Sequence, residues 1–107
     1  MYISDILHKM IKRKIEIEKV KKEILPILRN NGVIKAGLFG SFVRGEAKRD
    51  SDIDILVKLK GRKSLLDLAG LEIKLEEEFG RRVDLLTYNS LHPLIREKIL
   101  REEVRII

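Results

Sequence analysis

The sequence predicts an α+β fold in which a mixed β-sheet of about three to four strands is flanked by helices and preceded by an N-terminal helical extension. Short apolar runs beside glycine, such as Val33–Phe39, are typical of buried strands. A helical pattern separates the second and third of these runs, which favours a right-handed crossover between parallel strands. A long helical pattern comes before all of the strands. The central elements therefore alternate between strand and helix, as in α/β folds, and a helical segment precedes them.

The length of 107 residues predicts one domain, residues 1–107, with a helical segment at 1–31 and a catalytic core at 33–107. The sequence contains no Cys. A disulfide framework and a thiolate zinc site are therefore excluded.

The first segment, from Ser4 to about Asn30, has apolar residues at steps of three or four, which predicts a helix. Ser4 is expected to cap its start, and Gly32 follows its end. Pro26 lies inside the pattern and lacks a backbone N–H. We therefore expect a kink there, or a division into two helices.

The next elements are predicted from shorter patterns. Val33–Phe39 reads as a buried strand, Ser41–Arg44 as one helical turn, and Asp52–Leu59 as a second strand. Ser64 and Gly80 are expected to cap the two ends of a helix.

The last part of the chain continues the alternation of strands and helices. Val83–Thr87 reads as a third strand, parallel to the second, and Pro93 lies in the first turn of a further helix. We expect the apolar tail Val104–Ile107 to pack as a last strand or a core plug.

A Gly-Ser pair followed ten residues later by Asp-x-Asp is the most informative motif. Backbone N–H groups of the Gly40-Ser41 turn can bind phosphate, and Asp52 and Asp54, two apart on a strand, point the same way and can share hard cations. Each part alone is weak, because Gly-Ser is common in turns and Asp52 could be loop punctuation. An aspartate inside an apolar strand is costly unless a cation relieves it, so Asp54 favours a functional site.

Two further residues could join this site. Asp84 stands at the start of the third strand, although it could instead pair with Arg81 or Arg82. Arg44 follows Ser41 by one helical turn and could neutralise phosphate, although an ion pair with Glu46 or Asp50 is an equal alternative.

Phosphate and magnesium chemistry together indicate nucleotidyl transfer, which needs positioning and charge neutralisation more than covalent chemistry. In this scheme Asp52 and Asp54 hold two Mg²⁺ ions. Asp84 completes the ion on the nucleophile side and accepts the proton, while Gly40 and Ser41 hold the β- and γ-phosphates.

The spacing of Gly40-Ser41, Asp52-Ile53-Asp54 and Asp84, with Arg44-Gly45-Glu46 between the first two, resembles the minimal nucleotidyltransferases of the polymerase-beta superfamily. The similarity is greatest to the antitoxins of HEPN/MNT toxin–antitoxin pairs. It covers about Val33 to the C-terminus, and every catalytic position of the motif is occupied. The helical segment at the front is more than the minimal core needs.

This resemblance implies ATP as the donor, Mg²⁺ as the cofactor, and transfer of AMP to a tyrosine of a cognate HEPN ribonuclease toxin, which silences the toxin. Two alternatives stay open. One is an antitoxin that acts by binding alone, and the other is a nucleotidyltransferase with a small-molecule or RNA acceptor. Association with copies of itself or with the toxin also stays open.

The net charge of +6, from 23 Lys and Arg against 17 Asp and Glu, is spread along helices. Glu16, Glu18 and Glu23 interrupt the basic residues of the first segment, so we expect no direct nucleic-acid binding. We also expect His8 and His92 to have no metal-binding role. The absence of a long apolar stretch predicts no membrane partner and a cytoplasmic location.

Overall fold

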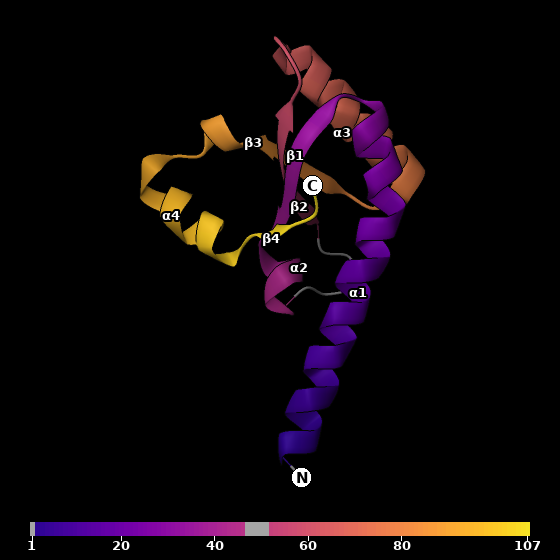
Figure 1. Ribbon diagram of the computed structural model, residues 1–107, viewed down its shortest axis with the longest axis vertical. Helices are drawn as coiled ribbons and strands as arrows, with labels where there is room; N and C mark the ends of the chain where they lie inside the picture. Colours follow the sequence, from indigo (N-terminus) through magenta and orange to yellow (C-terminus); the bar gives the residue numbers. More distant parts are fainter. Residues whose placement is uncertain (1, 47–51) are drawn as a thin grey trace.

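The computed structural model describes residues 2–46 and 52–107, which form a four-stranded mixed sheet with helices on both sides (Figure 1). This confirms the predicted fold class. The elements in chain order are α1 (Tyr2–Asn30), β1 (Val33–Phe39), α2 (Ser41–Arg44), β2 (Ile53–Leu59), α3 (Leu65–Phe79), β3 (Val83–Thr87), the 3₁₀ turn η1 (Tyr88–Ser90), α4 (Pro93–Glu102) and β4 (Val104–Arg105).

The strands lie in the order β3-β2-β1-β4. β1 runs antiparallel to both β2 and β4, whereas β2 and β3 are parallel and joined by α3. The crossover and the parallel pair are as the sequence predicts. The predicted tail strand is also confirmed, because β4 pairs with β1 and the next residue, Ile106, is buried.

The two faces of the sheet carry separate cores, because successive side chains of a strand point to opposite sides. Ile53, Ile55 and Val57 of β2 join the larger core with residues of α1 and α3. Leu56, between them, belongs to a smaller core with Phe39 and residues of η1 and α4. Figure 1 shows the sheet between α1 and α3 on one side and α4 on the other.

Both ends of α3 are capped as predicted. Ser64 and Asp67 form a reciprocal capping box, in which the Ser64 side chain accepts from the Asp67 N–H and the Asp67 carboxylate accepts from the Ser64 N–H. Gly80 ends the helix in the left-handed conformation at φ 75°.

α1 is one continuous helix, so the expected division at Pro26 is wrong. It also begins at Tyr2, so Ser4 lies in its first turn and is not its cap. Pro26 and Lys22, whose carbonyl loses its helical partner, are both exposed, which allows water to hydrate that carbonyl. The neighbouring Ile24 and Leu28 are fully buried and hold the helix on the sheet on both sides of the proline.

The first half of α1 projects from the body of the protein (Figure 1). Every residue from 3 to 16 is exposed, and burial in this helix begins with Ile17 and Val20. We call residues 3–16 the arm. The arm carries six large apolar side chains that are at least half exposed: Ile3, Ile6, Leu7, Met10, Ile11 and Ile15. Among the described residues, no helix is both long and apolar enough to cross a membrane.

Two truncations in α1 test this division of the helix. We expect Ile24→Ala to lower the free energy of unfolding by about 2–5 kcal/mol, because it leaves a cavity in the core. Ile11→Ala, the matched control in the exposed arm, should change it by less than about 0.5 kcal/mol. Urea denaturation of the three proteins measures both values. Equal losses in the two variants would contradict the projecting arm.

Candidate active site

The register of β2 brings the predicted site residues to one end of the sheet. Asp54 lies opposite Asp84 on the parallel strand β3 and opposite Phe39 on the antiparallel strand β1. Gly40 and Ser41 directly follow Phe39, and Asp52 directly precedes β2. The Gly-Ser turn and the three aspartates therefore meet at the same edge, as their positions in the sequence suggest.

The aspartates also share one face of the sheet. The side chains of Ile53 and Ile55 belong to the core under α1 and α3, so Asp54 between them points to the α4 side. The same alternation places Asp84, between buried Val83 and Leu85, on that side. Asp84 is exposed and Asp54 half-buried.

Gly40 has a backbone that favours glycine. Its φ of 81° and ψ of −159° lie in a region that other residues rarely adopt. A Cβ atom there would overlap the Asp54 carboxylate and lie 2.9 Å from its Cγ. The absence of a side chain thus lets the backbone of the turn lie directly against Asp54.

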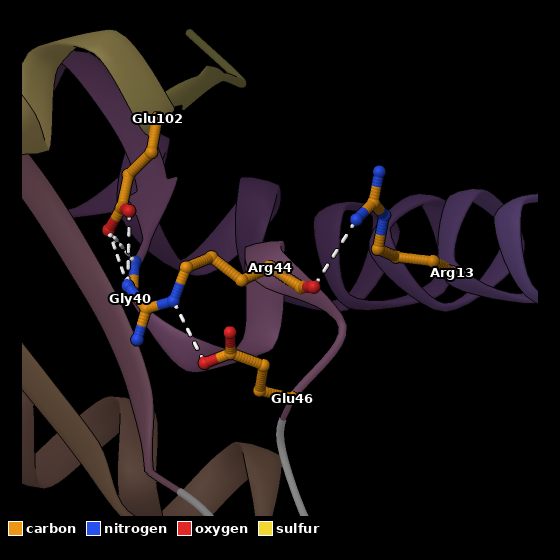
Figure 2. Close-up of polar contacts among 5 residues, drawn as sticks. All are labelled: Arg13, Gly40, Arg44, Glu46 and Glu102. Atoms are coloured by element: carbon orange, nitrogen blue, oxygen red, sulfur yellow. Dashed lines mark hydrogen bonds and ion pairs between the residues drawn. The ribbon is translucent and has the colours of Figure 1, made fainter.

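Arg44 connects the Gly-Ser turn to the C-terminal end of α4 (Figure 2). Its Nε donates to Glu46 at 3.0 Å, which confirms one of the two expected ion pairs; the other, with Asp50, lies outside the described residues. Its Nη1 donates to both carboxylate oxygens of Glu102, at 3.1 and 3.0 Å. The Gly40 N–H donates to Glu102 Oε1 at 2.8 Å.

Sequence reasoning missed Glu102. It follows Arg101 and precedes Glu103 in a charged stretch at the end of α4, and its sequence context is hardly different from that of Glu103. Glu103 instead accepts a hydrogen bond from the Tyr88 hydroxyl on the same side of the sheet. Only the pairing of β4 with β1 shows which of the two glutamates reaches the turn.

The arm is attached beside the same turn. Arg13 Nη1 donates to the Arg44 carbonyl oxygen at 3.3 Å (Figure 2). The Cβ position of Gly45 lies 3.1 Å from Arg13 Cδ. A cleft runs between the two elements, lined by Lys9, Met10, Lys12, Arg13, Glu16, Arg44 and Gly45.

Arg82, one of the two alternative partners considered for Asp84, lies beside Asp52 instead. The Arg82 Nε is 3.9 Å from Asp52 Oδ1, and both side chains are largely solvent-exposed. The Arg81 guanidinium lies 5.8 Å from the centre of the Phe42 ring. The long Arg82–Asp52 contact is a weak surface pair that a cation or phosphate could replace.

Burial raises the pKa of Asp54 to about 6, and the neighbouring Asp84 and Asp52 carboxylates add to the rise. Arg44 opposes it. The fold therefore holds a carboxylate where its charge is unfavourable, next to two more carboxylates. A divalent cation would relieve this repulsion directly.

The donor set suits Mg²⁺, since it consists of carboxylates on neighbouring strands. Within residues 2–46 and 52–107, no three His, Cys, Asp or Glu side chains form a group that could hold a metal ion. Mg²⁺ is commonly held by one or two carboxylates together with the phosphates of its substrate. The arrangement thus fits an ion that arrives with a nucleotide better than a permanently bound one.

Comparison with known proteins gives one family and several relatives. Residues 17–106 match the family described as nucleotidyltransferase domain. The chain is 52% identical over 91 residues to a candidate protein adenylyltransferase of Methanocaldococcus jannaschii, covering 85% of this chain and 98% of that protein. It is 51% identical over 75 residues to the protein adenylyltransferase MntA of Thermococcus cleftensis, covering 70% of this chain and 76% of that protein.

Among solved structures, the chain is similar to a crystal structure of a toxin–antitoxin with AMP-PNP. The TM-score is 0.72 at 26% sequence identity, and the match covers 81% of this chain and 72% of the other. The family match begins at Ile17, where burial of α1 also begins. The arm thus lies outside the residues that match the family and outside the packed part of α1.

Replacement of Asp54 should stabilise the protein in the absence of metal. The folded state raises the pKa of Asp54 to about 6, so the charged form opposes folding at pH 7, and stability should rise as the pH falls from 7 through 6 toward 4. We expect Asp54→Asn to raise the free energy of unfolding at pH 7 by about 1 kcal/mol, a figure reduced for solvent screening, and to flatten this dependence. Thermal unfolding in EDTA at several pH values measures both effects. A less stable variant would contradict the electrostatic strain.

A methyl group at position 40 should damage the turn. Gly40→Ala places its Cβ against the Asp54 carboxylate and forces a backbone conformation that costs about 1–3 kcal/mol. Gly70→Ala is a matched control, because a Cβ there meets nothing within 4 Å and its backbone is helical. Denaturant titration should show a loss for the first variant and no loss for the second.

Proposed function

This chain belongs to the nucleotidyltransferase domain family, among the minimal nucleotidyltransferases, and we propose that it transfers AMP from ATP to a tyrosine of a cognate HEPN ribonuclease toxin. The proposal makes the protein an antitoxin that silences its partner by covalent modification. The observation that carries it is the strand register that sets Asp54 against Asp84 beside the Gly40-Ser41 turn.

The relatives support a protein acceptor and an adenosine nucleotide donor. One of them is named as a candidate protein adenylyltransferase and another as a protein adenylyltransferase, and the toxin–antitoxin of similar fold holds AMP-PNP, an analogue of ATP. The described residues form one four-stranded sheet with its flanking helices. An acceptor protein would bring its own surface, and the exposed arm beside α2 offers it a place to bind.

In the proposed reaction the acceptor hydroxyl oxygen attacks the α-phosphorus of ATP. The bond from that phosphorus to the bridging oxygen of pyrophosphate breaks, and pyrophosphate leaves with the electron pair. The Gly40-Ser41 turn and Arg44 bind the β- and γ-phosphates, which orients the leaving group. Asp84, the most accessible of the strand aspartates, accepts the proton of the hydroxyl.

Asp52, Asp54 and Asp84 would hold Mg²⁺ together with the phosphates of the nucleotide, with no more than two of these carboxylates on one ion. When bound, Mg²⁺ lowers the pKa of the attacking hydroxyl and neutralises charge on the leaving pyrophosphate. The raised pKa of Asp54 adds a condition, because a proton competes with the metal below about pH 6. Asp54 therefore contributes fully to the site only at neutral and higher pH.

Transfer of AMP to the partner is measured by intact mass. The purified protein is incubated with ATP, Mg²⁺ and the product of the adjacent gene, which is tested as the HEPN partner. We expect a mass gain of one or more AMP groups on the partner, and no gain in EDTA. Asp52→Asn and Asp54→Asn should each lower the rate by at least about a hundredfold, because each removes a ligand of the metal. Glu77→Gln, which changes an exposed carboxylate of α3 on the other face of the sheet, is the matched control and should be as active as the wild type.

The same experiment separates the alternatives. Neutralisation of the toxin without a change of mass, equally by Asp54→Asn, would indicate an antitoxin that acts by binding alone. Consumption of ATP with AMP found on RNA or a small molecule would indicate another acceptor. Transfer at the wild-type rate by Asp54→Asn would contradict the site itself.

A further inference from the structure

Glu102 binds the two groups of the Gly-Ser turn that are best suited to bind an anion. Its Oε1 accepts from the Gly40 backbone N–H at 2.8 Å, and both of its carboxylate oxygens accept from Arg44 Nη1 (Figure 2). Its side chain is 17% exposed, compared with 63% for Glu46, the other partner of Arg44. Glu102 is thus a partly buried carboxylate held by a backbone amide and a guanidinium.

A backbone amide next to a guanidinium is also a typical binding site for phosphate. A carboxylate and a phosphate offer the same kind of charged oxygen acceptor to these donors. The Gly40 amide has one hydrogen, and Glu102 uses it. Arg44 likewise directs Nη1 to Glu102 and Nε to Glu46. A phosphate oxygen can bind these donors only in competition with Glu102.

We propose that Glu102 is an internal counter-anion that occupies the phosphate-binding donors of the Gly40-Ser41 turn and is displaced by the triphosphate of ATP. Glu102 thereby sets the affinity for nucleotide. This inference rests on the proposed nucleotidyltransferase function, and it adds a residue to which neither the motif nor the aspartates point.

The position of Glu102 suits such an exchange. It is the last residue of α4, and β4, which starts two residues later, is fixed to β1. Its flexible side chain can turn away from Gly40 while both elements stay in place. In the nucleotide-free protein the same carboxylate satisfies a buried amide and neutralises Arg44, so the turn keeps its shape before ATP arrives.

Binding of Mg²⁺ with AMP-PNP, which does not support transfer, measures the competition by isothermal titration calorimetry. We expect Glu102→Gln to lower the Kd by about tenfold, because the neutral amide is a weaker acceptor and no longer repels the triphosphate. Glu46→Gln removes the other carboxylate from Arg44 and leaves the Gly40 contact intact, so it is the matched control and should change the Kd by less than about twofold.

The outcomes separate this inference from the function on which it rests. Nucleotide binding by the wild type with an unchanged or higher Kd for Glu102→Gln would overturn the role of Glu102 and leave the proposed function standing. The absence of nucleotide binding by all three proteins would overturn both.

A measurement on the wild type covers the case in which Glu102→Gln does not fold. The side-chain carboxyl carbon of Glu102 is observed by NMR in ¹³C-labelled protein before and after addition of Mg²⁺ and AMP-PNP. We expect its resonance and the Gly40 amide resonance to move together, since both lose their shared hydrogen bond. Movement of the Asp54 carboxyl resonance with no change at Glu102 would overturn the proposal.

Discussion

The register of β2 against its two neighbours is the constraint on which the rest of the site depends. One residue, Asp54, lies opposite Asp84 on a parallel strand and opposite Phe39 on an antiparallel strand. A shift of one residue in either pairing would move the aspartates to the other face of the sheet or separate them from the turn. The fully buried Ile53, Ile55 and Val57 fix this register, so the core on one face positions the polar groups on the other.

That arrangement is costly without a ligand. Burial and two neighbouring carboxylates raise the pKa of Asp54, and a glycine with an unusual backbone lies against it. Arg44 brings positive charge near Asp54, but its guanidinium is already paired with the carboxylates of Glu46 and Glu102. The nucleotide-free site is therefore rich in negative charge on the metal side and internally neutralised on the phosphate side. A metal–nucleotide complex relieves the repulsion among the aspartates, and its phosphates replace the carboxylate that binds Arg44 and the Gly40 amide.

Sequence reasoning found what depends on local patterns. The strands, the parallel crossover, the capping of α3 and the meeting of Gly40 with the aspartates all follow from periodicity, turn residues and strand direction. Sequence reasoning failed where contacts between residues far apart in the chain determine the structure. Pro26 does not divide α1, because buried residues hold the helix on both sides of it. Glu102 could not be distinguished from Glu103, because a pairing far along the chain brings it to Gly40.

The arm is the part of α1 that extends beyond the packed body of the protein. The buried part of α1 packs on the sheet from Ile17 onward, and the family match begins at the same residue. The arm continues the helix beyond this packed part, and its six large apolar side chains are at least half exposed. A side-chain hydrogen bond from Arg13 of the arm reaches the carbonyl of Arg44. Arg44 thus accepts a hydrogen bond from the arm at its carbonyl oxygen and binds Glu102 through its guanidinium, so one residue joins the arm to the Gly-Ser turn.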